Sequence, residues 1–371
     1  MTPLEYAFVG GLSIACAMVI SPVVTFLSLR YSIRLVLNIG TILETLSLIT
    51  TSFATRSWHL FLSQGVCFGI GMGFLFIGSV GVVSQWFDRK RSLVNGITSS
   101  GSGTGGLIYS LAVGSMIPRL GFPWAMRILG ILCFVVNLIC GNLLRQRHRP
   151  STTRKQLLHF SLLHEPAYLV FLIWGILSAF GYVTLLFSLS SYITAVGYSQ
   201  HEGSIGSALL NMGMALGRPA VGFLSDYLGR VNVAGGATFL AGLFCLVIWI
   251  FASSLGVIYL FSVFGGLVAG TLWAAAPPLA VEAVGLSRLP DALGIFWLAI
   301  SPPCAVAEVI ALQLRNDETD NMPYIRVQLY NGFMYIGAAL SLILFQLLLY
   351  RRTRTERKTM VESERAAEQA N

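Results

Sequence analysis

The stretch GRPAVGFLSDYLGRVN, residues 217–232, joins two long apolar runs and carries unusual charges. Arg218 lies inside an apolar run, where a charge is energetically costly and therefore marks a candidate functional site. Asp226 and Arg230 follow in the loop, and Gly229 directly precedes the second arginine. The composition of the rest of the chain indicates which class of protein tolerates such a segment.

The composition is that of a membrane protein. Of the 371 residues, 55% are hydrophobic and only 11% are charged, and the mean hydropathy is +0.73. Soluble domains carry about 25% charged residues, so this chain has more apolar surface than a soluble core needs. All six cysteines lie in apolar runs and none forms a CxxC pair, which favours a packing role for them.

Eleven apolar runs are long enough to cross a bilayer, which takes about 20 residues each. Their continuous apolar character favours helices over the alternating strands of a membrane barrel. We therefore expect an all-α polytopic membrane protein with about 11 transmembrane helices, over residues 7–28, 35–53, 59–83, 93–116, 123–144, 167–189, 204–224, 233–253, 257–281, 291–312 and 329–350.

The distribution of basic residues predicts the orientation. Of the 24 Lys and Arg residues, two lie within the runs and only four lie on one side of the membrane, namely Arg56, Arg119, Arg315 and Arg326. The other 18 lie on the opposite side, which the positive-inside rule assigns to the cytosol. We expect a multi-pass protein of the cell membrane with a cytosolic C-terminus. The net charge of +8 then reflects topology, and no nucleic-acid partner is expected.

The longest cytosolic loop predicts a division into two bundles. We expect an N-terminal bundle of five spans over residues 1–144, a central cytosolic loop over 145–166, a C-terminal bundle of six spans over 167–350 and a cytosolic tail over 351–371. The basic residues at the start of the tail are suited to contact anionic lipid headgroups.

Glycine-rich segments are interpreted as helix-packing surfaces. The run GSGTGG, residues 101–106, fits the dinucleotide pattern GxGxxG, but it lies within an apolar run with no preceding strand. Glycines in such runs let neighbouring helices approach closely. The sequence contains no catalytic motif, metal-ligand spacing or cofactor motif, so we expect a protein that is not an enzyme and binds no metal or cofactor.

Polar side chains within the apolar runs are the candidate site residues. A guanidinium binds carboxylates bidentately and stays charged when buried, so Arg218 is suited equally to an anion site and to a structural pair. Asn211 and Trp273 are weaker candidates for a substrate-binding cavity. Glu44 and Glu308 are candidate proton carriers, and the alternative for each is an interhelical hydrogen bond.

The segment GRPAVGFLSDYLGR resembles the conserved loop of the major facilitator superfamily, in which Gly, Asp and Arg residues tie two helices together at the cytosolic face. The matching positions are Gly222, Asp226, Gly229 and Arg230. The resemblance implies that they are gating residues, with Asp226 and Arg230 pairing across the cytosolic face to bias the inward–outward equilibrium.

Longer segments are similar to the fungal branch of the monocarboxylate porter family, namely residues 8–24, 52–74, 85–110 and 120–131. The resemblance implies twelve helices in two bundles, with alternating access around a midplane cavity. It places Arg218 and Pro219 at the family's buried arginine and following proline. In mammalian members that arginine binds the substrate carboxylate, and an aspartate one turn earlier, here Met214, takes part in proton coupling. The family's first helix has no counterpart here, either because the gene model is truncated or because this is an eleven-span variant.

These features predict a secondary transporter that moves a small organic solute across a fungal membrane. We expect an exporter of an organic-acid or secondary metabolite, associated with a biosynthetic gene cluster. The alternatives are a proton-coupled monocarboxylate uptake permease, which Met214 disfavours, and a non-transporting sensor or inactive truncated remnant. We expect a monomer in the lipid bilayer, with a small organic anion as substrate.

Overall fold

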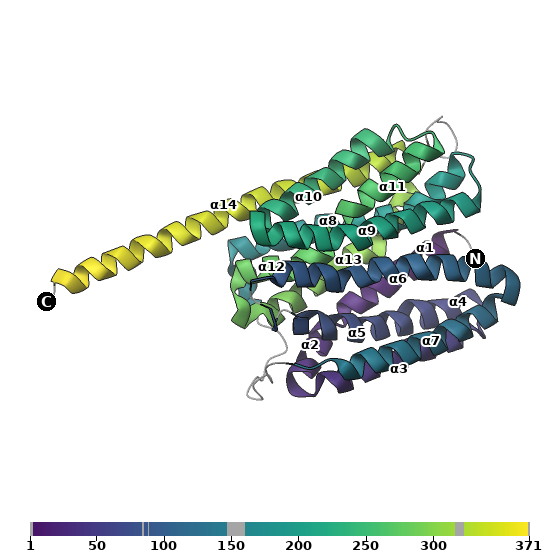
Figure 1. Ribbon diagram of the computed structural model, residues 1–371, viewed down its shortest axis with the longest axis horizontal. Helices are drawn as coiled ribbons and strands as arrows, with labels where there is room; N and C mark the ends of the chain where they lie inside the picture. The colour runs from purple at the N-terminus through teal and green to yellow at the C-terminus, as the bar shows by residue number, and fades with distance from the viewer. Residues whose placement is uncertain (1–2, 84, 88, 147–159, 316–322, 370–371) are drawn as a thin grey trace.

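The computed structural model describes residues 3–83, 85–87, 89–146, 160–315 and 323–369. Every regular element within these ranges is a helix, as the apolar runs predicted (Figure 1). The elements are α1 (Pro3–Val19), α2 (Ser21–Arg30), α3 (Ile33–Thr51), α4 (Ser57–Leu60), η1 (Phe61–Cys67), α5 (Phe68–Val83), α6 (Arg91–Leu120), α7 (Phe122–Leu143), η2 (Phe160–His164), α8 (Pro166–Ala195), α9 (Gln200–Leu228), α10 (Arg230–Phe244), η3 (Cys245–Trp249), α11 (Leu255–Ala269), α12 (Thr271–Val284), η4 (Leu286–Arg288), α13 (Leu289–Leu314) and α14 (Ile325–Gln369).

Nine helical segments in the described ranges have the length and apolar composition needed to cross a membrane. Two further helices, α6 and α9, have 30 and 29 residues but are less apolar, since glycine and serine are frequent in them. At about 1.5 Å per residue, each is about 45 Å long. That length exceeds the bilayer's hydrocarbon core of about 30 Å. Each of the eleven predicted runs therefore lies on a long helical segment.

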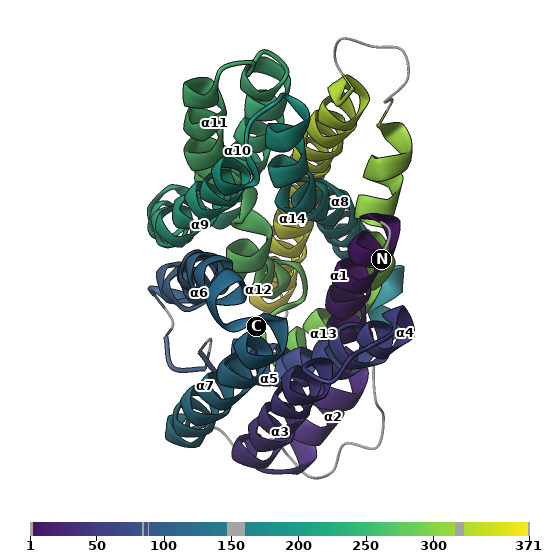
Figure 2. The same cartoon turned by 90° about the vertical axis from the view of Figure 1, so that its right-hand side faces the viewer.

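The helices form two groups that lie side by side, an N-terminal group of α1–α7 and a C-terminal group of α8–α14 (Figure 2). Two seams join the groups, one between α1 and α13 and the other between α6 and α9. At the first seam, the Ser21 hydroxyl donates to Gly294 O at 2.8 Å and the Ser301 hydroxyl donates to Ala15 O at 2.9 Å. The predicted domain boundaries stay a prediction, and much of the central loop lies outside the described residues.

Glycines allow the close approach of α6 to α9. A Cβ atom at Gly103 would lie 2.6 Å from Ala215 N, and one at Gly106 would lie 2.7 Å from Asn211 Cγ. A Cβ at Gly101 would meet nothing within 4 Å. The GSGTGG run is therefore a packing surface through Gly103 and Gly106, whereas Gly101 and Gly105, the glycines of this run expected to pack, do not meet α9.

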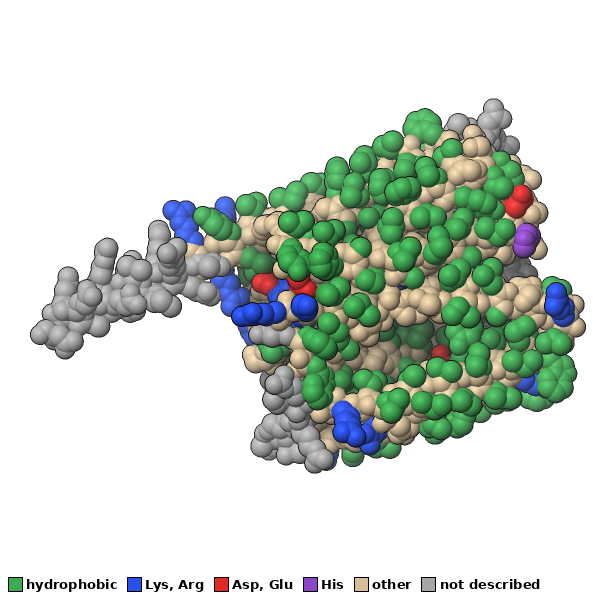
Figure 3. All heavy atoms as spheres, in the orientation of Figure 1, with side chains coloured by type: hydrophobic (Ala, Val, Ile, Leu, Met, Phe, Trp, Pro, Cys, Tyr) green, Lys and Arg blue, Asp and Glu red, His purple; other side chains and the backbone are tan. Residues whose placement is uncertain are grey.

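The outer surface suits a lipid environment. Hydrophobic side chains cover the face shown in Figure 3, and Lys and Arg side chains gather at its left end. We call this the basic end, since it carries Arg30, Arg91, Arg145, Arg230 and Arg288. The helix α14 runs unbroken through residue 351 and leaves the bundle at this end (Figure 1).

Candidate functional site

Arg218 connects the two helix groups from a buried position on α9. The residue is only 2% exposed. Its Nη1 donates hydrogen bonds to Ser99 O, at 2.5 Å, and to Ser102 Oγ, both on α6. Its Nη2 donates to Tyr182 OH on α8 at 3.5 Å. The Nε atom has no hydrogen-bond partner in the described part of the chain.

No carboxylate pairs with Arg218 within the described residues. The ion pairs found there are Arg230 with Glu282 and Arg288 with Glu165. Burying a cation without a counter-ion costs several kcal/mol, and proteins normally pair such charges. A buried guanidinium without a carboxylate partner is suited to bind an anion.

Trp273, on α12, lies in an aromatic cluster beside the arginine. Its ring meets Tyr182 edge-on, with centroids 5.6 Å apart, and Phe76 of α5 in the same way at 5.5 Å. It stacks on Trp297 of α13 at 5.7 Å with an interplanar angle of 12°. Because Tyr182 also contacts Arg218, the cluster links Trp273 to the guanidinium and spans both groups.

Asn211 lies on α9 two turns before Arg218, against the backbone of α6. Its side-chain amide donates to Ser207 O at 2.9 Å. No hydrogen bond joins Asn211 to Arg218 among the residues described. The substrate-binding role of Asn211 therefore stays a prediction.

The two candidate proton carriers lie in different groups, and each accepts one interhelical hydrogen bond. Glu44 of α3 accepts from Asn137 Nδ2 of α7 at 2.6 Å. Glu308 of α13 is 5% exposed and accepts from the Ser188 hydroxyl of α8 at 2.9 Å. These are the structural partners that the sequence allowed as the alternative, and proton transport by either residue stays a prediction.

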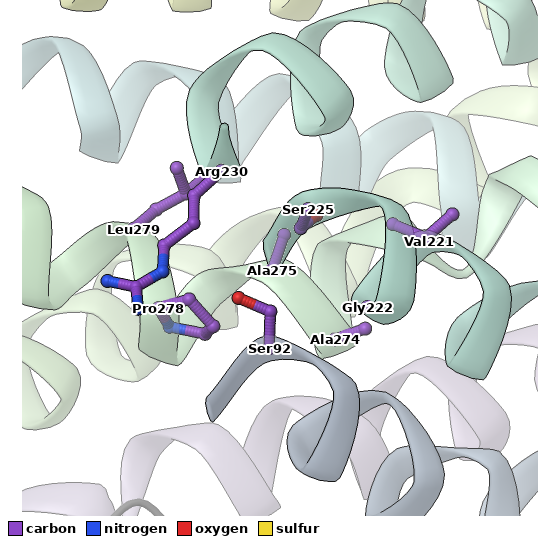
Figure 4. Close-up of a pocket in the computed structure, with 9 residues that line it drawn as sticks. All are labelled: Ser92, Val221, Gly222, Ser225, Arg230, Ala274, Ala275, Pro278 and Leu279. Carbon is purple, nitrogen blue, oxygen red and sulfur yellow. The ribbon is translucent and has the colours of Figure 1, made fainter. Parts of the chain in front are cut away.

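The four candidate gating residues lie at the basic end, where the last turns of α9 meet the start of α6. Figure 4 shows two of them, Gly222 and Arg230. The carboxylate of Asp226 accepts from the backbone N–H groups of Ser92, at 3.2 Å, and Leu93, at 2.9 Å. The first N–H groups of a helix have no partner within the helix and carry a partial positive charge, so a carboxylate there is stabilising. Asp226 therefore ties the C-terminal group to the N-terminal group.

Arg230 has a different partner. Its Nη1 lies 2.7 Å from Glu282 Oε1, on α12 of its own group. The chain turns between α9 and α10 at Gly229, whose φ of +94° favours glycine. The turn sends the two charges to different helices. Of the two residues predicted to pair across this face, Asp226 contacts the other helix group. The ion pair of Arg230 stays within its own group.

Gly222 sets the distance between α9 and α6. A Cβ atom there would lie 2.9 Å from Ser92 C and 3.0 Å from Leu93 Cα, both of them backbone atoms. Figure 4 shows Ser92 facing this part of α9, with Gly222 and Ser225 next to it. We call the meeting of Ser92 and Leu93 with Gly222 and Asp226 the basic-end contact.

Five residues of this region were not among the sequence-based candidates. Two of them, the Ser99 carbonyl and the Ser102 hydroxyl, lie in or beside the glycine run that was interpreted only as a packing surface. Tyr182, Phe76 and Trp297 lie in apolar runs. The sequence indicated only two of them, through the hydroxyl of Tyr182 and the indole N–H of Trp297, because each of these groups needs a hydrogen-bond partner when buried.

Comparison with known proteins identifies the family. The sequence profile of the Major Facilitator Superfamily matches residues 1–307. The chain is 33% identical over 342 residues to the probable transporter MCH2 of Saccharomyces cerevisiae, covering 91% of this chain and 72% of that relative. It is 28% identical over 368 residues to the uncharacterized transporter ESBP6 of the same yeast, covering 96% of this chain and 55% of the relative.

A further relative is named for efflux. The chain is 26% identical over 353 residues to the fujikurins efflux protein of Gibberella fujikuroi, covering 94% of this chain and 75% of that protein. The chain spans about three quarters of this relative and of MCH2, and about half of ESBP6. With a family match over most of its length, and nine helical segments in the described ranges that are long and apolar enough to cross a membrane, the chain belongs to the Major Facilitator Superfamily and is a multi-pass membrane protein.

Proposed function

We propose that this transporter exports a small organic acid of secondary metabolism and that Arg218 binds its carboxylate. The observation that carries the proposal is the buried guanidinium without a carboxylate partner in the described residues. Its Nε is unpartnered and its Nη2 makes only long contacts, to Tyr182 at 3.5 Å and to Met214 Sδ at 3.8 Å. These two N–H groups form one edge of the guanidinium, the edge that a carboxylate binds bidentately.

The direction of transport and the subfamily are also part of the proposal. The name of the fujikurins efflux protein supports export of a secondary metabolite. The Arg218–Pro219 pair supports membership of the fungal branch of the monocarboxylate porters. Proton-coupled uptake is less favoured, because the position one turn before Arg218 is occupied by the thioether of Met214, which binds no proton.

Alternating access gives the basic-end contact a role as a gate. We propose that this end faces the cytosol, as the basic loops favour, and that a solute reaches Arg218 from there when α6 and α9 separate. Separation breaks the hydrogen bonds of Asp226 to Ser92 and Leu93. The Arg230–Glu282 pair lies within one group and holds α10 to α12 throughout.

Deletion of the gene in its own organism tests the export function. We expect the intracellular-to-extracellular ratio of at least one organic acid to rise, because a route out of the cell is lost. The ratio is measured by mass spectrometry of cells and medium, and the wild-type gene should restore it. A ratio that stays unchanged for every acid detected would contradict export.

Gly270 offers a test of the position of Arg218. This residue lies between α11 and α12, and a Cβ atom there would be 2.6 Å from Arg218 Nε. We expect Gly270→Ala to displace the guanidinium and to lower export of the identified acid about tenfold, since a misplaced binding group loses about 1.4 kcal/mol or more. Gly256→Ala on α11 is the control, because a Cβ there meets nothing within 4 Å. Equal export by the two variants would show that Gly270 does not position the arginine.

A further inference from the structure

A groove of about 540 Å³ lies on the N-terminal helix group at the basic end. Its walls are the end of α5, the start of α6 and the end of α7, together with the loop between α5 and α6. Figure 3 shows the surface of the molecule hollowed between α6 and α7. In the described part of the chain, no residue of α8–α14 lines the groove, so it is a site of the N-terminal group alone and is separate from Arg218.

The wall of the groove is apolar and exposed. Trp86, Phe87 and Leu143 line it, and their exposed fractions are 49%, 46% and 74%. The other lining residues are Val82, Val83, Val94, Thr98, Cys140, Leu144 and Arg145. The volume falls within the range of about 300–1,000 Å³ that is typical of sites for small organic molecules. An exposed apolar groove on the side of a membrane protein is suited to hold a hydrocarbon chain.

A cation lies at the end of this apolar wall. Arg145 follows the last residue of α7 by two positions, and it is the one charged residue that lines the groove, as far as the structure describes it. The ion pairs of the described residues do not include its guanidinium. The loop over residues 85–90 adds Arg89 and Lys90 against Asp88. Basic groups between membrane helices on the cytosolic side attract the headgroups of anionic lipids.

Trp86 indicates the level of the headgroups. Its indole Nε1 donates to Arg145 O at 3.0 Å, which joins the loop to the end of α7. Tryptophan is enriched at the membrane–water interface, where its ring contacts apolar groups and its N–H meets polar ones. Since Trp86 and Arg145 lie together, the apolar wall faces the hydrocarbon and the guanidinium lies among the headgroups.

We infer that this groove binds one anionic glycerophospholipid, with an acyl chain along the apolar wall and the phosphate beside Arg145. A free anion would satisfy the guanidinium and leave the wall uncovered. An apolar helix would cover the wall and leave Arg145 without an anion. An anionic phospholipid does both, and the inference depends neither on the transported solute nor on the direction of transport.

Cys140 reports whether the groove is occupied. It lines the groove and is exposed, whereas the other five cysteines are buried or half-buried. The full chain is purified in detergent and freed of lipid, and modification of Cys140 by N-ethylmaleimide is followed by peptide mass spectrometry as lipid is added. We expect palmitoyl-oleoyl phosphatidylserine to slow the modification saturably. Phosphatidylcholine with the same chains should need an about fivefold higher concentration, in line with the loss of one basic contact to an anionic headgroup.

Two results would overturn the inference. One is equal protection of Cys140 by the two lipids, or protection by neither, because the groove would then not recognise an anionic headgroup. The other is a Cys140 thiol that is already protected before lipid is added, because the groove would then be covered by protein.

Arg145→Gln tests the headgroup contact. We expect this variant to lose the preference, so that the two lipids protect Cys140 at concentrations within about twofold of each other. Arg34→Gln is the matched control, since Arg34 is also exposed at the basic end, at the start of α3, and does not line the groove. It should keep the fivefold preference. The same preference in Arg145→Gln as in wild type would show that Arg145 does not hold the phosphate and would overturn the assignment.

Thr98→Trp tests the acyl-chain contact, because Thr98 lines the groove and a large side chain there fills it. Thr104→Trp is the matched control on the same helix. Both threonines are exposed, and each hydroxyl donates to the carbonyl four residues earlier, at 2.8 Å for Thr98 and 3.1 Å for Thr104. Retention of phosphatidylserine is measured by native mass spectrometry. We expect Thr98→Trp to weaken it about tenfold or more and Thr104→Trp to change it less than about twofold, whereas equal retention by the two variants would overturn the inference.

Discussion

Replacing Arg218 with methionine is expected to lower export of the acid about 100-fold. Removing one partner of a buried, hydrogen-bonded charge pair costs about 2–5 kcal/mol, and each 1.4 kcal/mol is a factor of about ten. In the proposed site the second partner is the substrate carboxylate, so we expect the loss to fall on transport. Export is measured by the intracellular-to-extracellular ratio of the acid in a deletion strain that expresses each variant.

The amount of Arg218→Met protein in the membrane is expected to stay within about twofold of wild type. Breaking a structural ion pair leaves one charge buried and unpaired, at a cost of about 3–5 kcal/mol. Arg218 has no carboxylate partner among the described residues, so its removal leaves no such charge. The lost hydrogen bonds from the charged guanidinium to Ser99 and Ser102 cost about 1.5–3 kcal/mol each, and removal of an uncompensated buried cation offsets that cost.

Arg127→Met is the matched control for Arg218→Met. Arg127 also lies within a span, on α7, where its Nε donates to Ser52 Oγ at 3.1 Å and its guanidinium lies 4.7 Å from the Phe53 ring centroid. We expect export to change less than about twofold, because these contacts lie within one helix group, away from the seams. Normal export by Arg218→Met would rule out the anion site. A collapse in the abundance of Arg218→Met would assign the arginine a structural role instead.

The positions of the spans could be predicted because the bilayer leaves few alternatives. A backbone in lipid must satisfy its hydrogen bonds internally, so a long apolar run becomes a helix. The predicted helices were found also for α6 and α9, which are not among the nine segments that qualify as membrane spans by length and hydropathy. Arg218 of α9 donates to Ser99 and Ser102 of α6 across their seam, where Gly103 and Gly106 bring the two backbones together.

The centre of the candidate site could be predicted, and its surroundings could not. Arg218 was evident because a charge in an apolar run is costly. Ser99 and Ser102 were not, because a Gly/Ser run has two functions in the same place. Its glycines bring α6 against α9, and that closeness is what lets the guanidinium reach the Ser99 carbonyl.

Pairings between distant segments depend on turns and packing that a single sequence does not display. Glu282 lies 52 residues from Arg230, and their pairing follows from the turn at Gly229 and the packing of α10 on α12. Trp297 shows the same limit. Its apolar run carried no charge to mark it, and only the placement of α13 beside α12 and α5 brings its indole into the aromatic cluster.

Gly222→Ala is expected to hold α6 and α9 apart at the basic end and to lower export about 20-fold. The added methyl carbon would lie within 3.0 Å of backbone atoms of Ser92 and Leu93, so α6 has to move. Overpacking of this kind costs about 1–3 kcal/mol, which shifts the ratio of closed to open forms about 5- to 150-fold. A transporter that cannot close this end cannot present its site to the other side. Gly236→Ala is the control, since its Cβ meets nothing within 4 Å.

A cysteine at Ser225 separates an open gate from a misfolded protein. Ser225 is 5% exposed and lines the pocket at the basic-end contact, so Ser225→Cys should react slowly with a maleimide in permeabilised membranes. Adding Gly222→Ala should raise the labelling rate about tenfold, in line with the shift in closed population. General loosening would also expose Cys245 and Cys304, which are buried within the helix groups. Faster labelling of Ser225→Cys with those two thiols still protected therefore identifies opening at the contact, whereas an unchanged rate would show that Gly222 does not hold this end closed.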